Sequence, residues 1–167
     1  MKLTDFFLSE LEAEAAGTRH AIERVPEGRN DWKPHEKSMA LGYLAALVAT
    51  MPGWIEMMIN TEELDFSAPD RPRTPELKTA KELVHAFDDC MNKARKALAE
   101  TSDEHLLKPW RLRAGAHILN EEPRYKMIQN SVFNHLAHHR GQLTVYLRLT
   151  GAKVPAIYGP SADEGSF

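Results

Sequence analysis

The pattern of apolar and polar residues along the chain predicts four long helices. Apolar residues recur every three or four positions over residues 3–24, 38–60, 74–101 and 125–150, and this spacing places them on one face of a helix. Pro52 lies inside the second segment, where a proline removes a hydrogen bond to the preceding turn, so we expect a kink there. Four amphipathic helices with little strand signal indicate an all-α protein, a four-helix bundle.

The connections between the predicted helices differ in character. Residues 65–75 contain three prolines and predict an irregular crossover. Thr74 is the expected cap of the third helix, with Pro75 in its first turn. Residues 103–124 follow neither the helical nor the strand period, so we expect a long irregular connection before the last helix, with short extended pieces. One domain over residues 1–167 is expected.

Composition and charge narrow the class of protein. The chain is 43% hydrophobic and 27% charged, which predicts a folded globular protein rather than a disordered one. A net charge of −3 gives no general attraction for nucleic acid or for an anionic membrane, and we expect neither as a partner. The single cysteine, Cys90, excludes an internal disulfide and any CxxC motif. A lone cysteine fits a reducing compartment, and acidic Asp5 and Glu10 argue against a secretory signal, so a cytoplasmic location is expected.

One uncharged stretch is long enough to be compared with a membrane-spanning helix. Residues 38–55 carry no charge over 18 residues, close to the ~20 that cross a bilayer. Gly42, Thr50 and the Pro52-Gly53 pair interrupt the stretch, and no basic flank marks an orientation. A helix buried on most faces inside a bundle explains the same pattern, and this is the interpretation we favour.

Three of the eight histidines lie in "NHLAHHRGQL", residues 134–143. His135 and His139 are four residues apart, so their Cβ atoms lie roughly 5–6 Å from each other on one helix face. Two neutral imidazoles at this spacing can bind one divalent ion, or they can bond to neighbouring carboxylates and carbonyls. His138 lies beside His135 on the helical wheel and could flank the same cleft. A metal site needs a third ligand from another helix, and the remaining histidines offer no clear candidate: His20, His35, His85, His105 and His117.

Longer stretches around these histidines resemble a known family. "NHLAHHRGQLTVYLRLTGAKVPAIYGPSADE", residues 134–164, resembles the C-terminal signature of DinB/YfiT-like proteins. The pieces "DWKPHEKSMALGYLA", "MPGW" and "TEELDF" resemble the second-helix region of that family, in matching order. The resemblance implies a four-helix bundle, often dimeric, that binds a divalent metal through three histidines. Members with known activity include thiol-dependent S-transferases and a maleylpyruvate isomerase.

On this resemblance His135 and His139 match two of the three metal ligands. The third ligand usually stands in the second helix, where "LAALVATMPGW" has Leu47 at the matching position. The resemblance therefore implies a degenerate metal site, with a weakly bound nickel or zinc ion or with no metal. It also implies a cleft between the second and fourth helices, which we expect to be lined by Leu47, Trp54, His138 and Tyr146.

Two classes of function remain open from the sequence. The first is a non-catalytic or small-molecule-binding member of the family, which keeps the fold and binds a small apolar molecule or a partner. The second is a metal-dependent thiol S-transferase or hydrolase, or a metal-free enzyme that uses His139 as a base. No phosphate-binding glycine loop, GxSxG or HExxH motif occurs. In either case we expect a homodimer.

Overall fold

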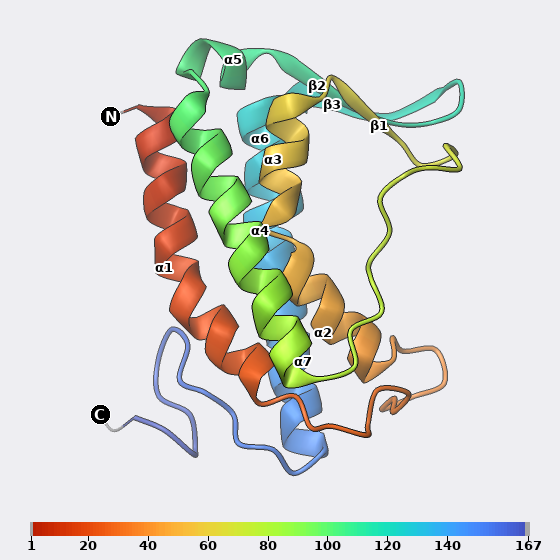
Figure 1. Ribbon diagram of the computed structural model, residues 1–167, viewed down its shortest axis with the longest axis vertical. Helices are drawn as coiled ribbons and strands as arrows, with labels where there is room; N and C mark the ends of the chain where they lie inside the picture. Colours follow the sequence, from red (N-terminus) through yellow and green to blue (C-terminus); the bar gives the residue numbers. More distant parts are fainter. Residues whose placement is uncertain (1, 166–167) are drawn as a thin grey trace.

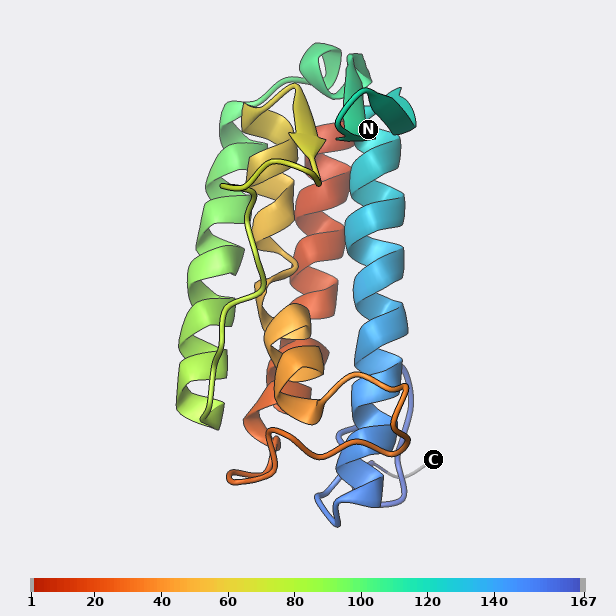
Figure 2. The ribbon, with the colours of Figure 1, turned by 90° about the vertical axis from the view of Figure 1, so that its right-hand side faces the viewer.

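The structure, a computed structural model, describes residues 2–165 and consists mainly of helices that run along one long axis (Figure 1). In chain order the helices are α1 (Leu3–Glu23), α2 (Leu41–Thr50), α3 (Gly53–Asn60), α4 (Ala80–Glu100), α5 (Asp103–Leu107), α6 (Arg124–Ile128), the π-helix η1 (Gln129–Asn134) and α7 (His135–Leu149). The last three follow one another without a break and form one continuous column (Figure 2). The chain is thus mostly helical, as the apolar pattern predicts.

The expectation of a purely α-helical protein is only partly correct, because three short strands form a sheet at one end of the helices (Figure 1). They are β1 (Glu63–Asp65), β2 (Pro109–Ala114) and β3 (His117–Pro123). β1 pairs parallel with β2, and β2 pairs antiparallel with β3. The last two strands occupy the connection that showed no clear period, where short extended pieces were expected.

The core lies between the long helices. Helix α4 packs against α1, α2 and α3, and α2 also packs against α7. Buried Phe7 of α1 stacks on Phe133 of η1, with ring centroids 5.7 Å apart. Burial of such apolar side chains from every long helix supplies the main driving force for this packing.

The predicted kink at Pro52 is confirmed. Helices α2 and α3 are separated by Met51 and Pro52 and are bent by 53° relative to each other. Eight of the ten residues of α2 are buried, which accounts for its uncharged sequence. Among residues 2–165 no single helix has the length and apolar character of a membrane span. The bent pair α2 and α3 meets that criterion only when the two are taken together, by length and composition alone.

The third long helix begins later than the sequence analysis predicts. Helix α4 starts at Ala80, and its cap is Thr79 rather than Thr74. The Thr79 hydroxyl accepts a hydrogen bond from the Glu82 backbone at 3.2 Å, and the Glu82 carboxylate accepts one from the Thr79 backbone at 3.1 Å. This reciprocal capping box stabilises the start of the helix at Ala80. Residues 66–79, here called the crossover segment, pass along the helices without regular structure (Figure 1).

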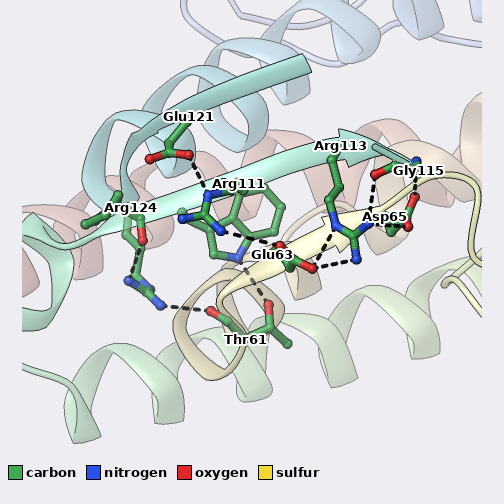
Figure 3. Close-up of polar contacts among 10 residues, drawn as sticks. Thr61, Glu63, Asp65, Arg111, Arg113, Gly115, Glu121 and Arg124 are labelled. Carbon is green, nitrogen blue, oxygen red and sulfur yellow. Dashed lines mark hydrogen bonds and ion pairs between the residues drawn. The ribbon is translucent and has the colours of Figure 1, made fainter. Parts of the chain in front are cut away.

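Buried Arg124, the first residue of α6, connects the sheet to the helices. Its guanidinium donates hydrogen bonds to the carbonyls of Met58 at 3.0 Å, Thr61 at 2.9 Å and Pro109 at 2.9 Å. It also pairs with the Glu62 carboxylate at 2.8 Å. Figure 3 shows this side chain beneath the sheet, directed at Thr61. One cation therefore holds together the end of α3, the start of β2 and the start of the last column.

We predict that Arg124→Met destabilises the protein severely. The substitution keeps the apolar stem but leaves the carbonyls of Met58, Thr61 and Pro109 without this donor, and each buried acceptor left unsatisfied typically costs about 1–3 kcal/mol. Urea unfolding measures the change. Arg111→Met is the matched control, because Arg111 pairs with Glu121 on the half-exposed face of the same sheet (Figure 3). An equal loss of stability in both variants would contradict the importance given to Arg124.

The Asp65 carboxylate at the sheet forms hydrogen bonds whose strength depends on pH. Its carboxylate accepts hydrogen bonds from the Ser67 hydroxyl at 2.7 Å, the Ser67 backbone at 2.9 Å and the Gly115 backbone at 3.0 Å. These bonds lower the pKa of Asp65 from 3.8 to about 2, and the bond from the Ser67 hydroxyl contributes most to this shift. The carboxylate therefore stabilises the fold above pH ~3.8, and this stabilisation is lost as the pH falls toward 2.

We accordingly predict that Asp65→Asn lowers the Tm at pH 6. The difference from the native chain should shrink between pH 4 and pH 2, because protonation removes the same contact from the native protein. Thermal melts across this range test the prediction. Asp70→Asn, at an exposed residue of the crossover segment, serves as the control. A difference in Tm that does not depend on pH would show that the Asp65 carboxylate contributes no charge-dependent stability.

Candidate functional site

A cleft of about 1030 Å³ lies between the crossover segment and the helices α2, α3, α4 and η1. We call it the crossover cleft. Its walls are largely apolar and include Trp54 and Met57 of α3, Phe66 of the crossover segment and Leu112 of β2. This volume is in the range of sites that bind small organic molecules, and apolar walls with few polar groups are typical of such sites.

Two of the four residues expected to line the cleft, Leu47 and Trp54, do so, whereas His138 and Tyr146 lie elsewhere. Leu47, Trp54 and His135 contribute to the wall of the crossover cleft. His138 is exposed on α7, with its ring centroid 4.9 Å from that of His139. Buried Tyr146 packs edge-on against Trp32 at 5.5 Å and donates a hydrogen bond to the Met39 carbonyl at 3.3 Å. His139 lies behind His135 and is only 5% exposed.

His135 and His139 face each other through their Nε2 atoms, which are 2.8 Å apart. On the far side of the pair, the Nδ1 atom of His139 lies 2.8 Å from the Gln142 Oε1 atom and donates its proton there. A contact of His135 with the Ser131 backbone favours the charged form of the ring. A neutral imidazole has one donor and one acceptor, so His139, which donates from Nδ1 to Gln142, can accept a proton donated by the Nε2 atom of a neutral His135. If neither Nε2 atom carries a proton, the two lone pairs face each other and could bind a cation.

The pKa of His135 is lowered from its usual value of 6.5, mainly because burial disfavours the charged ring. The neighbouring charges of His139 and His138 lower it further, and the hydrogen bond to Ser131 opposes the shift. The ring of His135 is therefore neutral at pH 7. Neutral imidazole is the form that binds metal ions.

The donor set fits a metal ion in part. Two nitrogens bound to zinc at 2.0–2.1 Å with a tetrahedral angle lie about 3.3 Å apart, so a small rotation of the two rings from 2.8 Å would admit the ion. Between residues 2 and 165, however, no group of three or more His, Cys, Asp or Glu side chains could hold a metal. Leu47, 6% exposed, offers no donor atom. Two protein ligands fall short of the three that catalytic zinc sites use.

The structure adds features that the sequence analysis missed. The π-helix η1 ends directly before His135, and π-helical turns are uncommon and often lie at functional sites. Gln142 bonds His139 from three positions further along α7, a spacing that was visible in the sequence but not used. Half-buried Cys90 of α4 also lines the crossover cleft. Burial raises the pKa of the Cys90 thiol, so this group is not an activated nucleophile.

The fold and the site together define a mostly helical protein with a paired-imidazole site beside an apolar cleft. The sequence model of the DinB family matches residues 1–166, and the chain belongs to that family. It is 27% identical over 160 residues to the uncharacterized protein YrdA of Bacillus subtilis (strain 168), covering 96% of this chain and 90% of YrdA. This result confirms the resemblance of residues 134–164 to DinB-like proteins.

Two solved structures share the fold. The DinB-like protein YjoA of Bacillus subtilis superposes with a TM-score of 0.67 at 19% identity, covering 89% of this chain and 94% of YjoA. A DinB-like protein of Bacillus cereus ATCC 10987 gives the same TM-score at 21% identity, covering 91% of this chain and 95% of the other. At these identities the likeness shows the common fold alone.

Proposed function

We propose that this chain is a small-molecule-binding member of the DinB family whose metal site has lost one ligand. The proposal rests mainly on the position of Leu47. This residue is almost fully buried and lines the crossover cleft together with His135, at the position where the family resemblance implies a third histidine. His135 and His139 then form a site that holds a divalent ion weakly, while the apolar cleft beside them binds an organic ligand.

The same proposal includes the finer description of the fold. The four helical columns, α1, α2 with α3, α4, and α6 through α7, correspond to the four-helix bundle of the family. The three-stranded sheet is then an addition that closes one end of the bundle. Placing the imidazole pair between packed helices is how bundles of this kind build metal sites.

A metal-dependent thiol S-transferase or hydrolase is the second candidate function, and the converging Nε2 atoms favour it. A divalent ion, when bound, would lower the pKa of a coordinated water or thiol. The contribution of the chain itself is to keep the His135 imidazole neutral through burial and to fix the orientation of His139 through Gln142. An organic substrate would lie against Trp54, whose ring centroid is 5.8 Å from that of His135.

We predict that Leu47→His completes a three-imidazole site. Loss of an indirect metal contact typically costs 10–100-fold in affinity, so adding a direct ligand should raise the affinity for zinc or nickel by more than about 100-fold. Bound metal should then stabilise the fold by roughly 2.7 kcal/mol at a concentration of one hundred times its Kd. Calorimetric titration and thermal melts of metal-stripped protein, prepared without a nickel column, measure both effects.

The control for this experiment is His139→Ala in the Leu47→His background, which should abolish the gain in affinity. If Leu47→His binds metal no more tightly than the native chain, position 47 does not face the imidazole pair as proposed. If the native chain already binds one equivalent at nanomolar affinity, the metal-dependent enzyme becomes the better proposal.

We also propose a homodimer that forms through the outer face of α7. Val145 is 56% exposed and Leu149 57% exposed, and their spacing of four residues places both on one face of the helix. The exposed Gly141, one turn earlier, has no heavy atom within 4 Å of where a Cβ would lie. Exposed apolar side chains beside a glycine allow a second helix to approach closely.

The native chain is therefore expected to be a dimer at tens of micromolar, a concentration on the scale of common Kd values. Val145→Asp with Leu149→Asp should yield monomers, because two charges would be buried without partners. Light scattering after gel filtration measures the mass. Ile118→Asp, at a residue 59% exposed on β3, is the control and should remain dimeric. A monomeric native chain would rule out the proposal.

A further inference from the structure

The two arginines at the crossover cleft form no ion pair, in contrast to most other arginines between residues 2 and 165. Across residues 2–165, eight of the eleven arginines form ion pairs with carboxylates. The exceptions are Arg29, Arg71 and Arg73, and the last two line the same cleft. Lys93 of α4 also lines it and forms no ion pair within the described part of the chain. Three cationic side chains that form no ion pair within residues 2–165 therefore line the same cleft.

The balance of charge in the cleft is opposite to that of the whole protein. Arg71, Arg73 and Lys93 face a single lining carboxylate, Glu56, whereas the chain carries a net charge of −3. The Arg71 guanidinium is held over the Phe66 ring at 5.6 Å from its centroid. Such stacking orients a guanidinium and leaves its N–H edge available for a ligand.

The positive and apolar parts of the cleft come from different elements. Arg71 and Arg73 lie on the crossover segment, whereas Trp54 and Met57 of α3 and Leu112 of β2 form apolar wall. Arginine forks bind carboxylate, sulfonate and phosphate oxygens through two parallel hydrogen bonds. A ligand that uses the whole cleft therefore needs an anionic group at one end and an apolar body at the other.

We infer that the crossover cleft binds an amphipathic organic anion, whose charged group pairs with Arg71 and Arg73 and whose aromatic or aliphatic body lies against Trp54 and Met57. The inference rests on the proposed small-molecule function and adds the chemical class of the ligand. Glu56 on the α3 side of the cleft repels a second negative group. A ligand with one anionic end is therefore preferred over a polyanion.

The test compares two dyes that differ in one charged group. Anilinonaphthalene sulfonate has the apolar body and the anion, and phenylnaphthylamine has the same body without the sulfonate. We expect the sulfonate to bind about tenfold more tightly, which corresponds to about 1.4 kcal/mol. Added salt should weaken the binding of the sulfonate dye and leave the binding of the neutral dye unchanged. Dye fluorescence gives the affinities, and the rate at which N-ethylmaleimide labels Cys90, the only cysteine, reports whether the cleft is occupied.

Arg71→Gln with Arg73→Gln should reduce the affinity for the sulfonate to that for the neutral dye, and should leave the neutral dye unaffected. Arg29→Gln with Lys81→Gln makes the same change in net charge at exposed residues outside the cleft, and should alter neither affinity. Thermal melts establish that both variants are folded.

The possible outcomes separate this inference from the proposed function. If both dyes bind with the same affinity and protect Cys90, or if the substitutions at Arg71 and Arg73 leave the sulfonate affinity unchanged, the preference for an anion is wrong and small-molecule binding stands. If neither dye protects Cys90 in the native chain, both the inference and the proposed binding function of the cleft are wrong.

Discussion

The structure depends most on the hydrogen bonds of one buried guanidinium, that of Arg124. Burying this cation costs several kcal/mol unless acceptors surround it, and the acceptors come from the end of α3 and from the residues around the start of β2. Since Arg124 opens the column that continues into α7, these bonds fix that column relative to α3. The two walls of the site, Trp54 on α3 and His135 on α7, depend on this alignment, because their rings lie only 5.8 Å apart.

A second buried arginine fixes the same column further along. Arg140 pairs with the Glu14 carboxylate at 2.5 Å and donates to the Thr18 hydroxyl at 2.8 Å, both on α1. Between Arg124 and Arg140 lies the π-helix η1, whose extra residue rotates the following face of the helix by roughly 100° relative to an uninterrupted α-helix. Because the column is held at Arg124 and at Arg140, the π-helix between them contributes to the direction in which His135 and His139 point.

The site combines two environments that favour different parts of a ligand. Burial keeps His135 neutral, so this ring can offer a lone pair to a cation, whereas the crossover segment offers cationic guanidinium groups. The apolar surface between them comes from α3 and β2. In the proposed function, Leu47 takes the place of the third histidine that the family resemblance implies; it is a buried hydrocarbon side chain without a donor atom, and the Nε2 atoms of His135 and His139 face each other.

The sequence alone determined the parts of this protein that depend on neighbours a few residues apart. The helical period located the long helices, Pro52 located the kink, and the spacing of four placed His135 and His139 on one face. The start of α4 was also a local signal, in Thr79 and Glu82, although Thr74 with Pro75 was taken in its place.

Only the tertiary structure decided the features made by contacts between distant residues. Asp103 caps the start of α1 by accepting hydrogen bonds from the Leu3 and Thr4 backbone. The strand β1 finds its partner in β2, far along the chain. The crossover cleft joins segments from α2 to η1. Such contacts produce no periodic pattern in the sequence, because the two partners lie far apart along the chain and become neighbours only on folding.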